Sequence, residues 1–190
     1  INFDYQLIDT EEERRELYEI LITSKILALD TETTSTDPID AELVGMSFSI
    51  KENQAFYVPV PPNYDEAQKI VKEFQSIFEN EEILKVGQNM KYDLLVLGNY
   101  GVELRGPMFD TMIAHYVLQP ELRHNMDYLA EIYLNYETIR IEELIGAKGK
   151  NQGNMRDLPA EAVYQYACED ADVTLKLKNI LEKELETNGV

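Results

Sequence analysis

The chain has 190 residues and a formal net charge of −19, from 36 acidic and 17 basic side chains. An acidic excess of this size argues against nonspecific attraction to duplex DNA, because proteins that bind the DNA backbone usually carry a basic excess. The single cysteine excludes an internal disulfide, and no stretch approaches the ~20 consecutive apolar residues of a membrane span. We therefore expect a soluble, intracellular protein with no membrane partner.

The length fits one folded domain with one core. Residue 1 is an isoleucine and not an initiating methionine. We therefore expect residues 1–190 to be a single domain cut from a longer chain.

The first third of the chain has the pattern of a sheet with one helix. Thr10 and Glu13 have the spacing of a capping box, which predicts a helix to about Thr23. Three apolar runs with short connections predict an antiparallel meander of strands. The strands are expected at 26–30, 43–50 and 55–60, after an extended piece at 3–8.

The remainder of the chain is mostly helical in pattern. Apolar residues at helical spacing predict one helix over 65–78, and a short apolar run predicts a parallel strand at 83–86. Further helices are expected at 91–99, 110–118, 126–134 and from Pro159 onward, with Asp110 and Asn125 as N-caps. The composition of 146–154 predicts a mobile loop within the domain.

Two acids close the first strand of the meander. Asp30 and Glu32 are two residues apart, so in an extended strand both side chains point to the same face. Neighbouring carboxylates favour a cation between them, and an all-oxygen ligand set suits Mg²⁺ or Mn²⁺. Alone, the pair is also typical of a solvated strand end, so a metal site requires further acids nearby.

Further acids occur where the fold could bring them to the same point. Asp93 is expected in the first turn of a helix that follows a strand, beside exposed backbone amides. Tyr166 and Asp170 are four residues apart on the final helix and share a face, whereas Glu169 and Asp172 point elsewhere. Taken alone, Tyr166 and Asp170 also fit a half-buried aromatic residue and a solvated acid.

In combination, these motifs resemble those of the DEDDy 3′-to-5′ exonucleases, and in particular the proofreading exonuclease domains of bacterial DNA polymerase I. The resemblance covers roughly Leu27 to the end of the chain. The stretches that carry it are Asp30-Thr31-Glu32, Gln88-Asn89-Met90-Lys91-Tyr92-Asp93, Phe109-Asp110-Thr111-Met112, Arg123-His124-Asn125-Met126-Asp127, Gly149-Lys150-Asn151-Gln152 and Tyr166-Ala167-Cys168-Glu169-Asp170. It implies an α/β, ribonuclease H-like fold with a mixed five-stranded sheet, three strands antiparallel and two parallel, flanked by helices.

The resemblance also implies two-metal-ion hydrolysis that removes nucleoside 5′-monophosphates from the 3′ end of single-stranded or frayed DNA, as in proofreading during replication and repair. Asp30, Glu32 and Asp170 match the ligands of one Mg²⁺ or Mn²⁺ ion, and Asp30 and Asp93 match those of the second. Tyr166 matches the tyrosine that orients the attacking water. These five residues form the expected catalytic centre.

Other positions match residues that contact the substrate in this family. The expected set is Thr31, Thr36, Gln88, Asn89, Tyr92, Arg123, Met155 and Tyr166. Thr36 departs from the pattern because relatives carry a bulky apolar wedge there, and Met155 stands where a second apolar contact is usually aromatic. The metal site is therefore expected to be complete, whereas the 3′ end of the strand is expected to bind more weakly than in relatives.

Four further residues carry a charge or an imidazole but are not assigned to the catalytic centre. Lys148 and Lys150 either add positive charge near a phosphate or belong to a solvated loop. The two histidines, His115 and His124, are expected to be structural or surface residues and not metal ligands.

Two alternatives remain open from the sequence. Some relatives keep the fold but have lost the acids and act as a structural module of the polymerase, although the acids and the tyrosine are all present here. The second alternative is an RNA-processing exonuclease of the same superfamily. By resemblance we expect a monomeric domain in the bacterial cytoplasm, with the polymerase domain of the same parent chain as its partner.

Overall fold

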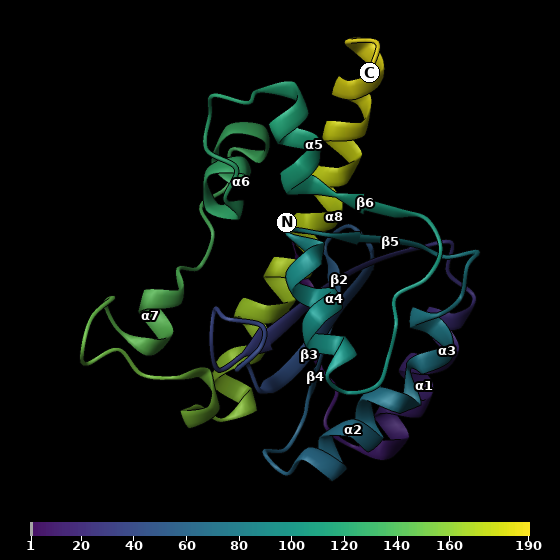
Figure 1. The fold of residues 1–190 in the computed structure, drawn as a ribbon, viewed down its shortest axis with the longest axis vertical. Coiled ribbons are helices and arrows are strands. Elements are labelled where there is room, and N and C mark those ends of the chain that lie inside the picture. Colours follow the sequence, from purple (N-terminus) through teal and green to yellow (C-terminus); the bar gives the residue numbers. More distant parts are fainter. Residues whose placement is uncertain (1) are drawn as a thin grey trace.

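A single mixed sheet organises the computed structural model, which describes residues 2–190 (Figure 1). Within these residues the sheet has six strands in the order β1-β4-β3-β2-β5-β6. Their bounds are β1 Asp4–Leu7, β2 Ile26–Thr33, β3 Leu43–Lys51, β4 Gln54–Pro59, β5 Leu84–Gly87 and β6 Met108–Asp110. The strands β2, β3 and β4 are antiparallel neighbours, and β5 and β6 extend the sheet in parallel from β2.

The predicted arrangement of three antiparallel and two parallel strands is therefore confirmed, and the sheet has one strand more than predicted. The extra strand, β1, comes from the extended piece at the start of the chain and pairs in parallel with β4. Its side chains are alternately exposed and half-buried, so it lacks the apolar run that marks a central strand.

Helices cover both faces of the sheet (Figure 1). Their bounds are α1 Glu11–Ile22, α2 Tyr64–Glu73, α3 Gln75–Phe78, α4 Met90–Gly98, α5 Thr111–Leu118, α6 Met126–Leu134, α7 Ile141–Ile145 and α8 Ala160–Thr187, with a 3₁₀ helix at Met155–Asp157. The long helix α8 contacts β1 to β5 on one face, and α5 and α6 pack against it. No helix in this part of the chain is both long and apolar enough to cross a membrane.

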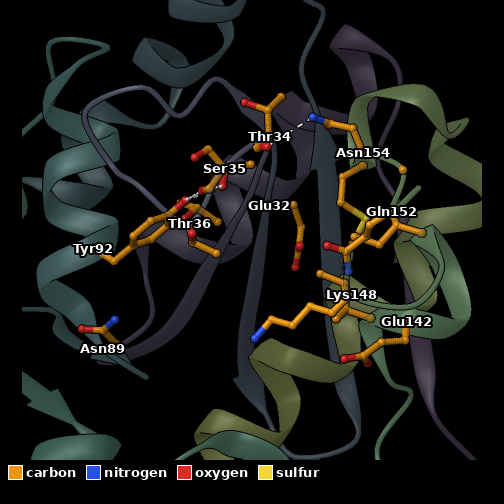
Figure 2. Close-up of a pocket in the computed structure, with 16 residues that line it drawn as sticks. Glu32, Thr34, Ser35, Thr36, Asn89, Tyr92, Glu142, Lys148, Gln152 and Asn154 are labelled. Atoms are coloured by element: carbon orange, nitrogen blue, oxygen red, sulfur yellow. Dashed lines mark hydrogen bonds between the residues drawn. The ribbon is translucent and has the colours of Figure 1, made fainter. Parts of the chain in front are cut away.

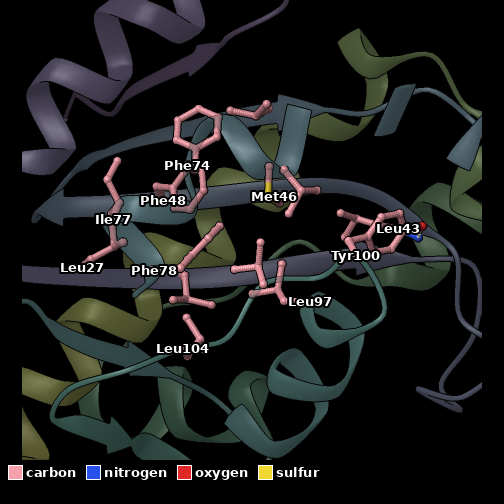
Figure 3. Close-up of a cluster of buried hydrophobic side chains, with 14 of the residues drawn as sticks. Leu27, Leu43, Met46, Phe48, Phe74, Ile77, Phe78, Leu97, Tyr100 and Leu104 are labelled. Carbon is pink, nitrogen blue, oxygen red and sulfur yellow. Dashed lines mark hydrogen bonds between the residues drawn. The ribbon is translucent and has the colours of Figure 1, made fainter. Parts of the chain in front are cut away.

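The main core lies between the opposite face of the sheet and helices α1 to α4 (Figure 3). Phe48 from β3 packs there against Phe74 and Phe78, with ring centroids 5.5 and 5.9 Å apart. From β2, Leu27 and Leu29 belong to this core, whereas Ala28 packs with Leu175 of α8 on the other face. Because side chains alternate along a strand, the even-numbered residues of β2 face α8.

Several predicted boundaries change in the structure. The predicted helix 65–78 is two helices, separated at Phe74, whose backbone (φ −102°, ψ 5°) leaves the helix while its ring is fully buried. The strand predicted to end at Asp30 continues to Thr33, because residues 31–33 still pair with β3. The capping box of Thr10 and Glu13 is present.

Three short elements were not located along the chain from the sequence, although the resemblance implied a second parallel strand, which is β6. Strand β6 and the 3₁₀ helix have three residues each, and α7 has five. Elements of this length contain too few positions to show a hydrophobic period. The N-cap prediction for Asp110 is confirmed by bonds from two backbone amides, whereas Asn125 occupies the N-cap position of α6 without a side-chain bond.

Candidate active site

The site is built at the end of strand β2, at the centre of the sheet. Asp30 and Glu32 follow Ala28 on the face that α8 covers. On α8 the buried residues Ala167 and Ala171 lie against the sheet, and their small side chains allow the helix to approach closely. The helix thereby brings Asp170 to the two strand carboxylates.

Three carboxylates meet at this point. Oxygen atoms of Asp30, Glu32 and Asp170 lie within 4.8 Å of one another. Tyr166, one turn before Asp170 on α8, lines the same cavity of about 310 Å³. The prediction that Tyr166 and Asp170 share a face is therefore confirmed.

The neighbouring acids on α8 point elsewhere, as predicted. The Glu169 carboxylate accepts bonds from the Tyr136 hydroxyl and the Ile139 amide, at 2.6 and 2.7 Å. Asp172 is fully buried and accepts a bond from the Asn53 amide at 2.8 Å. Both acids thus hold distant segments of the chain against α8.

A fourth carboxylate, Asp93, enters from α4. Its side chain is 2% exposed, and its Oδ1 accepts a hydrogen bond from the Thr31 hydroxyl at 2.6 Å. Asp93 does not belong to the group of three acids whose oxygens lie within 4.8 Å of one another, but it lines the same cavity. The structure therefore brings all five predicted catalytic residues, Asp30, Glu32, Asp93, Tyr166 and Asp170, around one cavity.

Four ionised carboxylates without a bound cation are electrostatically unfavourable in this cavity. Burial, reinforced by the charges of neighbouring acids, raises the pKa of Asp30, Glu32 and Asp170 well above their ordinary values. Burial also raises the pKa of Asp93 to about 7, although the hydrogen bond from Thr31 opposes the shift. Among residues 2–190, none of these four acids forms an ion pair with a lysine or arginine.

These residues fit a hard divalent cation. The Glu32 side chain is 6% exposed, and its Oε1 has no hydrogen-bond partner in the described part of the protein. A buried carboxylate oxygen without a partner is unfavourable, whereas a cation shared with Asp30 and Asp170 would satisfy it. An all-oxygen set of this kind is typical of Mg²⁺ or Mn²⁺ sites.

A second, larger cavity of about 560 Å³ adjoins the first (Figure 2). The two cavities share the lining residues Thr31, Glu32, Asn89 and Tyr92. Figure 2 shows Glu32 between the loop that carries Thr34 to Thr36 and the segment that carries Lys148, Gln152 and Asn154. Glu32 is therefore accessible to a ligand lying in the larger cavity.

The predicted substrate contacts divide among three locations. Thr31, Thr36, Asn89, Tyr92 and Met155 line the larger cavity, whereas Gln88 and Tyr166 line the carboxylate cavity. Arg123 is exposed on the connection between α5 and α6 and lines neither cavity.

Two of these side chains are already engaged within the protein. The Gln88 side-chain nitrogen donates to the carbonyl of His124 at 2.6 Å. Met155 is 2% exposed and packs with the apolar cluster beneath the cavity. Each therefore presents only part of its surface to a ligand.

Two of the backbone amides expected to be exposed at the start of α4 are occupied in the structure. The backbone N–H groups of Asn89 and Met90 donate to the Asp110 carboxylate, at 3.0 and 2.7 Å. A helix start usually offers free amides to an anion, but here a carboxylate of the protein already accepts them. Asp93 therefore lies at a capped helix end.

Other lining residues of the larger cavity were not identified from the sequence. They are Ile141, Glu142 and Ile145 on α7, and Gln152 and Asn154 beyond it. Gln152 lay in one of the stretches that carry the family resemblance, without an assigned role. Lys148 was considered for its charge, and it lines the cavity while Lys150 does not. The two histidines have the expected structural role, because His115 is buried and its Nδ1 lies 2.6 Å from that of His124.

The mixed sheet with acids at the end of its central strand, facing an acid on a long helix, defines a ribonuclease H-like exonuclease fold. Solved structures agree: Escherichia coli RNase D has a TM-score of 0.75 at 22% identity, over 98% of this chain and 46% of that chain. Brucella melitensis NrnC has a TM-score of 0.73 at 20% identity, over 100% of this chain and 84% of that chain. At these identities the likeness concerns the fold alone.

A family model described as 3′-5′ exonuclease matches residues 5–186. The chain is 36% identical to DNA polymerase I of Borreliella burgdorferi over 97% of its length, and 41% identical to that of Pseudomonas aeruginosa over 86%. The chain belongs to the family of 3′-5′ exonuclease domains of DNA polymerase I. It spans about a fifth of the length of these relatives, 20% and 19% respectively.

Proposed function

We propose that this domain hydrolyses the last phosphodiester bond at the 3′ end of a single-stranded or frayed DNA strand and releases nucleoside 5′-monophosphates one at a time. The observation that carries the proposal is the gathering of four carboxylates and Tyr166 around one cavity that adjoins a larger one. Membership of the 3′-5′ exonuclease family supports the same reaction.

The carboxylates would hold two divalent ions, Mg²⁺ or Mn²⁺. Asp30, Glu32 and Asp170 are the ligands proposed for one ion, because their oxygens lie within 4.8 Å of one another. Asp30 and Asp93 are the ligands proposed for the second. Bound ions of this kind lower the pKa of water and stabilise the charge that develops on phosphoryl oxygens.

Tyr166 has the environment of a group that orients the attacking water. Burial and the neighbouring acids raise the pKa of its hydroxyl above the ordinary value, so the side chain is neutral at physiological pH. A neutral phenol donates and accepts hydrogen bonds but is a poor base. The water adds its oxygen to phosphorus and its proton goes to the departing 3′ oxygen as the P–O3′ bond breaks.

The larger cavity has the mixed lining that a terminal nucleotide requires. Asn89 and the side-chain oxygen of Gln152 provide hydrogen-bonding groups, and Ile141 and Ile145 provide apolar surface. Apolar contact matters here because Thr36, at the position of the family's wedge, is a small polar residue.

Lys148 is the positive group of this cavity. Figure 2 shows its side chain extended into the space between α7 and α4. A lysine at this position is placed to bind a phosphate of the strand, which the surrounding acids would otherwise repel.

We further infer that residues 1–190 act as one domain of a longer, monomeric DNA polymerase I in the bacterial cytoplasm. The relatives of which this chain covers about a fifth support this reading. With a net charge of −19, the isolated domain is expected to bind DNA weakly. The polymerase domain of the parent chain would deliver the frayed 3′ end for proofreading.

The reaction is tested by identifying its products. The domain is incubated with a single-stranded DNA oligonucleotide and Mn²⁺, and the products are separated by anion-exchange chromatography. Nucleoside 5′-monophosphates are expected, and EDTA should abolish them. Nucleoside 3′-monophosphates or internal fragments would contradict the proposed bond cleavage.

The substrate class is tested by comparing DNA with RNA of the same sequence. Relatives at 36–41% identity are DNA polymerases I, whereas the RNase D likeness is limited to 22% identity. We therefore expect faster hydrolysis of the deoxyribo-oligonucleotide. A clear preference for RNA would favour an RNA-processing role instead.

A further inference from the structure

Asp110, at the end of β6, joins the N-termini of two helices. Its carboxylate accepts the amides of Asn89 and Met90 at the start of α4, at 3.0 and 2.7 Å. The same carboxylate accepts the amides of Met112 and Ile113 at the start of α5, at 2.9 and 3.4 Å. One side chain therefore satisfies backbone donors that two helix ends would each leave unpaired.

The next residue, Thr111, extends this contact to the preceding turn. Thr111 is fully buried, and its hydroxyl donates to the carbonyl of Gly87 at 3.2 Å and bonds the side-chain oxygen of Gln88. Together, Asp110 and Thr111 hold residues 87–90, which form the whole turn from β5 into α4.

This turn has a conformation that requires support. Asn89 lies in the left-handed region, with φ 63° and ψ 57°. Asparagine enters this region more readily than most other non-glycine residues, and contacts from the surrounding structure can hold it there. The bond from the Asn89 amide to Asp110 is such a constraint, and it acts at the residue that lines both cavities.

The turn also determines where α4 places its carboxylate. Asp93 is one helical turn after Asn89 and lines the carboxylate cavity. A change in the direction in which α4 leaves β5 would move Asp93 relative to Asp30 and Glu32, which are fixed by the sheet. Asp110 itself lines neither cavity next to the carboxylates.

We propose that Asp110 and Thr111 are positioning residues that set Asn89 and Asp93 against the carboxylates of β2. This inference rests on the proposed function, because it assigns Asp93 to the second of the two metal ions. A helix cap that served stability alone would leave metal affinity unchanged in the folded protein, and this difference separates the two roles.

The test compares Asp110→Asn with Thr10→Ala, a matched variant that removes the N-cap of α1 far from the cavity. Three quantities are measured: amide hydrogen exchange at Asn89 and Met90, Mn²⁺ binding by calorimetry, and kcat and KM on single-stranded DNA. Thr111→Val is measured in parallel, because it keeps the side-chain shape and removes only the hydroxyl.

In Asp110→Asn we expect faster exchange at both amides and a loss of affinity for the second Mn²⁺ ion, for which Asp93 is a proposed ligand. The rate kcat should fall and should recover partly at high Mn²⁺ concentration. Thr111→Val should change in the same direction, whereas Thr10→Ala should lower only the melting temperature. Folded Asp110→Asn and Thr111→Val proteins with unchanged Mn²⁺ affinity and kcat would overturn the proposal.

The measurements also distinguish failure of this inference from failure of the proposed function. A wild-type domain that binds Mn²⁺ without cleaving DNA would contradict the proposed function, while exchange and Mn²⁺ affinity would still decide the role of Asp110. A wild-type domain that binds no Mn²⁺ would overturn both proposals.

Discussion

At the scale of single residues, Asp93 shows most clearly that burial disfavours ionised carboxylates in the metal-free site. Its carboxyl is 2% exposed, and burial raises its pKa to about 7. At neutral pH and without a metal ion, folding therefore opposes the ionised form of this group. The same side chain accepts the Thr31 hydroxyl through Oδ1, a bond that an amide oxygen can also accept.

Asp93→Asn is therefore expected to stabilise the domain in EDTA. The substitution removes a buried charge and keeps the hydrogen bond from Thr31, so the melting temperature should rise by a few degrees at pH 8, at about 2–4 °C for each kcal/mol. Thermal unfolding in EDTA measures the effect, with the exposed Asp9→Asn as control. A lower melting temperature for Asp93→Asn would contradict the conclusion that the ionised Asp93 carboxylate destabilises the metal-free fold.

Substitution of Thr36 tests how tightly the domain binds the terminal base of the strand. It is exposed at the rim of the cavity that Ile141 and Ile145 also line. Thr36→Leu is expected to lower KM for single-stranded DNA with little change in kcat, because the leucine side chain adds apolar surface that the terminal base can bury in the ground state and the transition state alike. Steady-state digestion measures both parameters. An unchanged KM would mean that Ile141 and Ile145 already supply the apolar contact.

At the scale of elements, the placement of α7 depends on a tether, the hydrogen bonds by which Glu169 of α8 holds the segment that precedes α7. None of its residues is buried, and the segment that leads into it is held by bonds from Tyr136 and Ile139 to the Glu169 carboxylate. The wall of the larger cavity is therefore positioned by these bonds together with the packing of Ile141, Leu144 and Ile145 on the cluster around Met155.

Removal of this tether is expected to loosen the wall of the cavity. Glu169→Ala leaves the Ile139 amide and the Tyr136 hydroxyl without their acceptor, which should lower the free energy of unfolding by ~1–3 kcal/mol. Limited proteolysis should also become faster within 139–153. The exposed Glu161→Ala is the control on the same helix. Equal proteolysis of the two variants would exclude the tether.

The elements that the sequence predicted are those with local signals. The capping box of Thr10 and Glu13 and the N-cap Asp110 are each visible as residue types at fixed spacing, and both are present. The break at Phe74 was not predictable, because the apolar period continues through it and only the sheet beneath determines where the chain turns.

The residues of the site also divide into those with a local sequence signal and those placed by contacts between distant segments. Strand and helix periods predict that Asp30 and Glu32 share one face and that Tyr166 and Asp170 share another. The family resemblance joined these two pairs in one site, and the structure brings them together. The lining of the larger cavity by Ile141 and neighbouring residues depends on how a segment with little regular structure folds back over β2. Such contacts between distant segments leave no periodic pattern in the sequence.

At the scale of the whole molecule, the raised pKa of the buried acids makes stability depend on pH. For Asp93 the native state keeps its proton up to about pH 7, whereas the unfolded state releases it near pH 4. The native state therefore binds more protons between these values, and the free energy of unfolding falls as the pH rises through this window.

The metal-free domain is thus expected to melt at a lower temperature at pH 8 than at pH 5. Millimolar Mg²⁺ or Mn²⁺ should raise the melting temperature at pH 8, because the ions bind the folded site and neutralise the acids. Scanning calorimetry with and without EDTA measures both effects. A melting temperature at pH 8 that does not respond to either ion would contradict a formed metal site.

The most direct test of the account is digestion of a single-stranded DNA oligonucleotide labelled at its 5′ end. The reaction is run with Mg²⁺ or Mn²⁺, beside EDTA and Asp93→Ala controls. We predict a ladder that shortens stepwise from the 3′ end with the wild-type domain and is lost in both controls. No ladder at high concentration of a folded, metal-binding domain would contradict independent exonuclease activity, and an Asp93→Ala ladder as fast as that of the wild type would contradict the proposed role of Asp93.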